Sequence, residues 1–143
     1  MKRAVKKVII FLAIIIFLFG FMIVFSRYGW KLFGFMMCDS PNEIFADNIT
    51  VEDDEVNLRL NEVTSISSYA GYIYKIEDGN LYIGIKHNIL FAALSGNIDY
   101  NISIRTKDSK IRNIYFKDNQ NIWLIWNESE GRIKHSDIKP QKY

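Results

Sequence analysis

The chain has 143 residues, 49% of them hydrophobic and 24% charged, and a formal net charge of +2. This length leaves room for one domain with one hydrophobic core. Residues 1–38 contain six basic residues and no acidic one, whereas residues 39–143 contain twelve basic and sixteen acidic residues. The part that can fold into a domain is therefore mildly acidic, which argues against nucleic acid as a partner.

An uninterrupted apolar stretch, VIIFLAIIIFLFGFMIVF, occupies residues 8–25. As a helix it spans about 27 Å, close to the ~30 Å hydrocarbon core of a bilayer. Four basic residues precede it within residues 1–7, and only Arg27 and Lys31 follow it closely. The positive-inside rule then predicts a cytoplasmic basic N-terminus at 1–7, a transmembrane helix at 8–25 that contacts the lipid bilayer, and an extracytoplasmic remainder. The expected location is the cell membrane, with a single span.

Two alternatives to an uncleaved signal anchor depend on processing. A cleaved signal peptide has a shorter apolar region, roughly 7–15 residues, and small residues at its cleavage site, which SRYGW at residues 26–30 does not provide. A lipoprotein would carry its lipid on Cys38, but large side chains precede this cysteine where a lipobox has small ones. Since Cys38 is the only cysteine, no intramolecular disulfide is possible. We expect an anchor with an unmodified juxtamembrane thiol.

Residues 26–47 form a juxtamembrane aromatic segment and linker between the span and the domain. The aromatic residues are Tyr28, Trp30, Phe33 and Phe35. Such rings suit the headgroup region of a bilayer, where amphipathic aromatic side chains collect. The following Asp39-Ser40-Pro41-Asn42 is typical of a turn.

Alternation of apolar and polar residues dominates residues 48–127, which is typical of half-buried strands. It is clearest at residues 56–61 and 97–105, and Ile49 and Val51 indicate a shorter leading strand. The sequence therefore predicts an extracytoplasmic β domain over 48–127.

The strongest turn signal is Asp78-Gly79, which separates two alternating runs. Asp-Gly favours a two-residue type I′ turn, because both central residues need positive φ. This turn predicts a register with Tyr74 opposite Ile83. The predicted inward-facing residues are Tyr72, Tyr74, Ile76, Leu81, Ile83 and Ile85, and the predicted outward-facing residues are Lys75, Glu77, Asn80, Tyr82 and Lys86.

A second hairpin is predicted from residues 110–116 to 121–126, with a turn at 117–120. Because IWLIW at 122–126 is apolar on both faces, its strand is expected in the centre of a sheet, covered on both sides. Residues 88–95 are ambiguous between strand extension and a short helical turn.

About seven short strands with turns every eight to twelve residues predict an all-β fold. We expect an antiparallel two-sheet sandwich, immunoglobulin-like in the broad sense, preceded by one N-terminal transmembrane helix; a small barrel is the alternative. Residues 128–143 form a polar C-terminal tail that is expected to fray.

The layout of a basic start, one hydrophobic helix and strands such as GYIYKIEDGNLYIGIK and IYFKDNQNIWLIW resembles that of small membrane-anchored exported proteins of low-GC Gram-positive bacteria. The abundance of Ile, Asn and Lys is also similar to that of proteins from AT-rich genomes. This resemblance implies a location at the cell envelope.

Recognisable catalytic and cofactor motifs are missing from the sequence. The two histidines, His87 and His135, are not spaced as a pair of metal ligands. Serine-hydrolase, phosphate-binding and dinucleotide-binding signatures do not occur. The acidic run at residues 52–55 lacks the spacing of an EF-hand and indicates a solvated turn. We therefore expect no enzyme activity, no cofactor and no metal.

Four aromatic residues are candidate ligand contacts: Tyr82, Tyr115, Trp123 and Trp126. They are placed to form a platform for glycan strands, although core packing or cross-strand pairing is the competing interpretation. The function hypothesis is a membrane-anchored, non-catalytic module that binds a protein partner or supports an envelope complex. The alternative is a glycan-binding module, or an enzyme whose site is assembled from loops.

Overall fold

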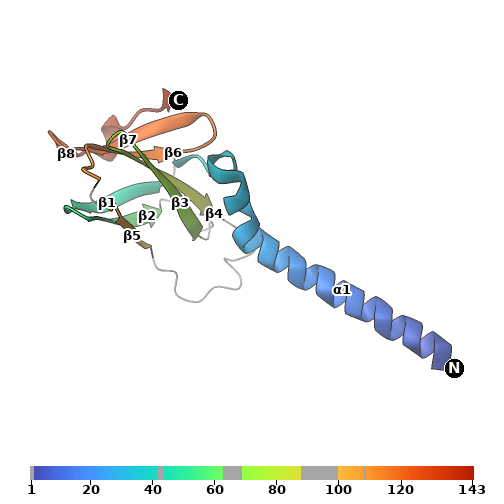
Figure 1. Ribbon diagram of the computed structural model, residues 1–143. Coiled ribbons are helices and arrows are strands. Elements are labelled where there is room, and N and C mark those ends of the chain that lie inside the picture. Colours follow the sequence, from blue (N-terminus) through green and yellow to red (C-terminus); the bar gives the residue numbers. More distant parts are fainter. Residues whose placement is uncertain (1, 42–43, 63–68, 88–99, 108) are drawn as a thin grey trace.

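The chain begins with a long helix, α1 (Lys2–Tyr28), that projects from one side of a β domain (Figure 1). The structure, a computed structural model, describes residues 2–41, 44–62, 69–87, 100–107 and 109–143. At 1.5 Å per residue, α1 is about 40 Å long, and it is long and apolar enough to cross a membrane. None of its most apolar stretch is buried within the protein, so α1 is not a core helix and is suited to contact with lipid.

The β domain consists of two sheets. Sheet A has the strand order β1 (Ile44–Val51), β2 (Glu55–Glu62) and β5 (Asn101–Arg105). Sheet B has the order β3 (Tyr69–Glu77), β4 (Asn80–His87), β6 (Asn113–Lys117), β7 (Asn121–Asn127) and β8 (Gly131–Arg132), and β9 (Gln141–Lys142) also pairs with β7. The predicted fold class, a β-sandwich after one N-terminal helix, is confirmed.

One strand pair departs from the antiparallel pattern, because β4 and β6 run parallel. After β4, the chain leaves sheet B, contributes β5 to sheet A and returns to sheet B as β6. A parallel pair needs such a long crossover, whereas a short turn would impose an antiparallel pair.

The core lies between the sheets and is built from alternate side chains of the strands, as period-two patterning requires. Sheet A contributes Ile44, Ala46, Val56, Leu58, Leu60, Ile102 and Ile104. Sheet B contributes Leu81, Ile83, Ile85, Ile114, Phe116, Trp123 and Ile125. Nearly all are aliphatic, which suits close packing without buried polar atoms.

The hairpin β3–β4 has the predicted register, with Tyr74 opposite Ile83 and Tyr72 opposite Ile85. Both turn residues have positive φ, 52° for Asp78 and 78° for Gly79, as a type I′ turn requires. The prediction that Tyr74 is buried is wrong, because its side chain is 46% exposed. Tyr74 lies on β3, the edge strand of sheet B.

The second predicted hairpin is confirmed as β6–β7, with a bulge between Ile114 and Tyr115 in the pairing. Ile114 lies opposite Trp126 and Tyr115 opposite Leu124, so Ile125 is the extra residue of β7. The bulge lets both Ile125 and Trp126 pack against the core. As predicted, β7 lies inside the sheet, but Leu124 on its outer face is only partly covered.

Two boundaries differ from the sequence-based expectation. Strand β1 begins at Ile44, four residues before the predicted start of the domain. Residues 128–143, expected to fray, contribute β8 and β9, which pair with β7 through backbone hydrogen bonds. Backbone pairing requires no apolar pattern, so the polar sequence gave no sign of it. Residues 88–95 lie outside the described residues.

Candidate functional site

The four aromatic residues predicted as ligand contacts do not form a single platform. Tyr82 and Tyr115 stack on the outer face of sheet B, with ring centroids 5.3 Å apart. Trp123 is buried in the core, and Trp126 lies at one end of the sandwich. The alternative interpretation, core packing and cross-strand pairing, therefore describes Trp123 and the tyrosine pair.

The tyrosine pair is itself largely covered. Tyr143, the last residue, packs edge-on against Tyr82 at 5.6 Å between ring centroids. The amine of Lys117 lies over the rings of Phe35, Tyr82 and Tyr143. Burial lowers the pKa of this amine, because removal from water disfavours its charged form. Tyr82 and Tyr115 thus belong to an aromatic cluster in which Tyr82 is buried, Tyr115 is partly covered and Tyr143 is exposed.

Residues 29–39, here called the connector, join α1 to the β domain and pack on the outer face of sheet B. They include a 3₁₀ segment, η1 (Gly29–Met37), that is interrupted at Gly34. Trp30 is only 3% exposed, and its indole Nε1 donates a hydrogen bond to the Arg27 carbonyl at 2.9 Å. The Trp30 ring is therefore covered by protein, whereas Tyr28 and Phe33 of the predicted interface segment are exposed.

Two glycines of sheet B make room for the connector. A Cβ added to Gly71 of β3 would lie 3.5 Å from the Trp30 ring. At Gly84 of β4, an added Cβ would overlap Cys38 Sγ and come within 2.9 Å of the Phe35 ring. The connector therefore occupies space that any larger residue at position 84 would fill.

Asp39 fixes the end of the connector to the end of β4. Its Oδ1 accepts a hydrogen bond from Lys86 Nζ at 2.6 Å, and its Oδ2 accepts one from the His87 backbone N–H at 2.5 Å. Burial alone would raise the pKa of Asp39, but hydrogen bonds from His87 and Lys86 outweigh it and lower the pKa. The predicted turn-forming linker is thus held to the sheet at its first residue.

Cys38 is a buried thiol, only 8% exposed. Burial, together with the neighbouring Asp39 charge, raises its pKa to about 12. A thiol with this pKa is protonated near neutral pH and is a poor nucleophile. Its role in the structure is to pack over Gly84.

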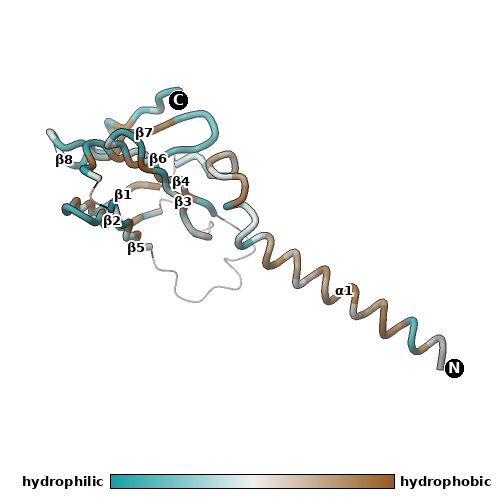
Figure 2. Tube along the Cα trace, viewed as in Figure 1, coloured by the Kyte–Doolittle hydropathy of each residue, from teal (hydrophilic) through white to brown (hydrophobic). Residues whose placement is uncertain are grey.

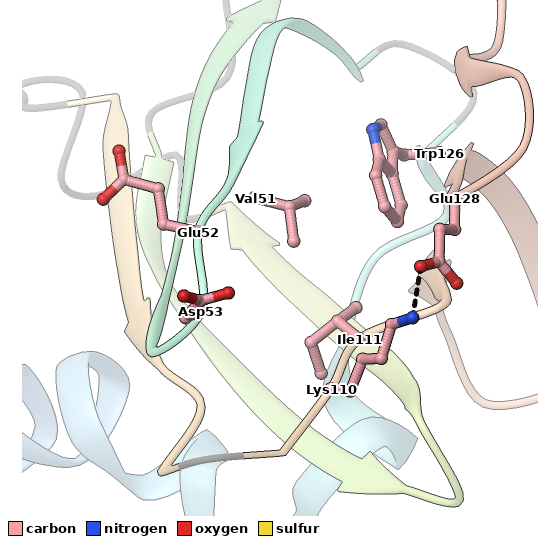
Figure 3. A pocket seen from close by; sticks show the side chains of 7 residues that line it. All are labelled: Val51, Glu52, Asp53, Lys110, Ile111, Trp126 and Glu128. Atoms are coloured by element: carbon pink, nitrogen blue, oxygen red, sulfur yellow. Dashed lines mark ion pairs between the residues drawn. The ribbon is translucent and has the colours of Figure 1, made fainter.

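A cleft of about 490 Å³ opens at the end of the sandwich where β1 turns into β2. It is lined by Val51, Glu52, Asp53, Lys110, Ile111, Trp126 and Glu128. Figure 3 shows the Val51, Ile111 and Trp126 side chains facing the middle of the cleft, with Lys110 and Glu128 paired at its rim. The Lys110 Nζ–Glu128 Oε1 distance is 2.5 Å.

Backbone hydrogen bonds hold the walls of this cleft. The N–H of Glu52 donates to the Glu55 carbonyl at 2.8 Å, and that of Thr106 donates to Asp54 at 2.8 Å. On the opposite wall, the N–H of Glu128 donates to the Arg112 carbonyl at 2.8 Å. The cleft is therefore preformed, which reduces the conformational entropy lost when a ligand binds.

Sequence reasoning identified Trp126 but not the cleft around it. The lining residues come from the β1–β2 turn, the segment before β6 and the end of β7. More than fifty residues separate the β1–β2 turn from the other two segments. The acidic run at 52–55 is a turn between strands, as predicted, and its first two side chains line the cleft. The one local signal of the cleft in the sequence is the apolar residue Val51 next to this acidic run.

Among the residues that the structure describes, no group of three His, Cys, Asp or Glu side chains is placed to hold a metal ion. Comparison with known proteins gives no match to a family model, a curated protein or a solved structure.

Proposed function

We propose that this chain is a single-pass membrane protein with a cytoplasmic N-terminus and an extracytoplasmic, non-catalytic β domain that binds a protein partner at the cell envelope. This proposal rests mainly on the cleft, which lies at the end of the sandwich remote from α1. In Figure 1, α1 leaves the domain on the side opposite β8, which follows Glu128 of the cleft. A domain anchored through α1 then presents the cleft away from the bilayer.

The chemistry of the cleft favours a segment of protein that carries a basic residue next to an apolar one. Val51, Ile111 and Trp126 provide an apolar surface, and an aromatic ring also attracts a cation over its face. The rim has three carboxylates and one amine, and that amine is paired with Glu128. Among the described residues, Glu52 and Asp53 form no ion pair, so their charges are available to a basic partner.

The same geometry supports a binding role over catalysis. Catalytic acids and bases work in sites where burial and neighbouring charges shift their pKa values. The Lys110 and Glu128 side chains are 74% and 49% exposed, so water screens their charges. No hydroxyl or thiol nucleophile stands beside a base among the residues that line the cleft.

Site-specific photo-crosslinking in cells tests this function. A photoreactive amino acid at Glu52, on the cleft, should give a discrete adduct with a partner protein. The same amino acid at Asn57, on the outer face of sheet A, should not. Equal adducts from both positions, or retention of envelope glycan by the cleft without any protein adduct, would contradict the proposal; the second result would support the glycan-binding alternative.

Thiol labelling on intact cells tests the orientation separately. A cysteine at exposed Asn119 should react with a membrane-impermeant reagent, whereas one at Lys2 should react only after lysis. Reaction at Lys2 alone would reverse the proposed topology.

A further inference from the structure

The connector has a second apolar surface, on the side that faces away from sheet B. Leu32 is 82% exposed and Met36 is 68% exposed, and Phe33 and Met37 are also exposed. Trp30 of the same segment is buried on the domain. Large apolar side chains that stand singly on a surface need no explanation, but four within six residues form a patch that indicates a partner.

This patch follows the apolar surface of α1 after a short interval that contains Arg27 and Lys31. The helical stretch that contains the candidate membrane span runs from Val5 to Met37, with a kink at Gly34. In Figure 2 the hydrophobic colour covers most of α1, gives way to paler and hydrophilic colour at its end, and returns in the connector. Thirty-three residues are too many for a straight span, because about 20 helical residues cross the hydrocarbon core. With α1 inserted across a bilayer, the last part of the stretch would extend beyond the core, toward the membrane surface.

The backbone of the connector provides the change of direction that this placement needs. Gly34 has φ 58° and ψ −142°, a combination that side-chain-bearing residues rarely adopt, and it divides η1 into two turns. Arg27 and Lys31 flank the start of the connector, where cationic side chains reach lipid headgroups. Apolar side chains next to cations are the composition of a segment that lies in the interface.

We propose that the exposed face of the connector lies in the outer leaflet of the bilayer at the level of the headgroups and upper acyl chains, with Leu32 and Met36 in contact with lipid. The inference rests on the proposed insertion of α1. Because Trp30, Cys38 and Asp39 fix the connector to sheet B, lipid contact on its other side holds the β domain against the membrane in one orientation. The connector is then a layer between the bilayer and sheet B.

Spin-label accessibility in the full-length protein tests this placement. The protein is reconstituted in vesicles of phosphatidylethanolamine and phosphatidylglycerol in equal amounts, with Cys38→Ser as the background. Single cysteines are labelled at Leu32, Met36, Phe17 of α1 and Asn57 of sheet A, and collision of each label with oxygen and with a water-soluble nickel complex is measured. Circular dichroism confirms that each variant retains its β structure.

Labels at Leu32 and Met36 should collide more often with oxygen than with the nickel complex, as the label at Phe17 should. The label at Asn57 should collide more often with the nickel complex. If Phe17 favours oxygen but Leu32 and Met36 behave like Asn57, the connector is solvated and the inference is wrong, although the anchor stands. If Phe17 also favours nickel, the proposed anchor itself fails. Protection of Leu32 and Met36 from both reagents would mean that a second copy of the chain covers the patch, which also overturns the inference.

Discussion

The two outer faces of the sandwich differ sharply, although their inner faces are both aliphatic. The outer face of sheet A is polar and forms an open, shallow surface lined by Asn48, Thr50, Asn57, Arg59, Asn101 and Ser103. The outer face of sheet B carries Gly71, Gly84 and the Tyr82–Tyr115 pair, and it is covered by the connector and by Tyr143.

This difference shows how a sheet specifies where another layer attaches. Polar side chains keep the face of sheet A hydrated, so covering them would leave hydrogen-bonding groups without partners. At Gly84 the absence of a side chain leaves a recess on sheet B, and Cys38 and Phe35 fill it. The attachment of α1 to the domain thus depends as much on the missing side chain at Gly84 as on the side chains that sheet B carries.

Filling the recess should have the largest effect. Gly84→Ala forces a methyl group against Cys38 Sγ and the Phe35 ring, and overpacking of this kind costs about 1–3 kcal/mol. Asn57→Ala, the matched change on sheet A, should stay within about 0.5 kcal/mol. Thermal unfolding of the full-length protein in detergent, followed by circular dichroism, measures both.

A double variant sharpens this test. Cys38→Ala removes the Sγ atom that the new methyl group meets, so its effect should be less than additive with that of Gly84→Ala. Equal losses for Gly84→Ala and Asn57→Ala, or full additivity, would show that the connector does not pack as described.

Gly34→Ala tests the bend in the connector without a steric clash. An added Cβ at Gly34 meets no atom within 4 Å, so the loss of stability comes only from the positive φ. This strain costs about 1–3 kcal/mol. The connector should detach before the sandwich unfolds, which limited proteolysis after Arg27 or Lys31 would detect. Gly20→Ala in α1 is the control, since its Cβ also meets no atom and its helical backbone accepts alanine. The same cleavage rate in both variants would contradict the role of Gly34.

Asp39→Asn should have a smaller, pH-dependent effect of about 1 kcal/mol, because the carboxylate is partly exposed. The folded-state pKa of Asp39 is lowered, so its stabilisation is complete above the ordinary carboxyl pKa of about 4 and is lost as the pH falls through the lowered value. Unfolding curves of the wild type and the variant should therefore converge in acid. A difference that grows as the pH falls would have the wrong sign.

The last expected effect is on a rate, the alkylation rate of the Cys38 thiol. With its pKa raised to about 12, only about one thiol in ten thousand is ionised at pH 8, so alkylation by iodoacetamide should be slow. In Gly84→Ala, where the connector is displaced, the reaction should accelerate. Fast alkylation of the wild-type protein would mean that the recess on sheet B is open.

The parts of the fold that were predicted depend on signals that are local in the sequence. The apolar run at 8–25 specifies a helix suited to lipid, and Asp78-Gly79 with its flanking alternation specifies the β3–β4 register. In both cases the residues that set the burial pattern and those that set the backbone conformation lie within about twenty residues of one another.

The remaining features depend on contacts between distant segments. Nothing in the sequence pairs Gly84 with Cys38, since a glycine in a strand predicts a close approach but not its partner. The parallel pairing of β4 with β6 depends on the crossing through β5, and the exposure of Tyr74 depends on the edge position of β3. The bulge at Ile125, which turns Trp126 toward the core, has no local signal.

The central claim is that the connector fixes the orientation of the β domain relative to α1, and a distance measurement between the two tests it most directly. Spin labels at Val24 of α1 and at Asn57 of sheet A, in the Cys38→Ser background, report this distance by pulsed dipolar spectroscopy in lipid vesicles. A docked connector predicts one narrow distance distribution, which Gly84→Ala should broaden. A broad distribution in the background protein, unchanged by Gly84→Ala, would contradict the claim and show that the domain moves freely on its anchor.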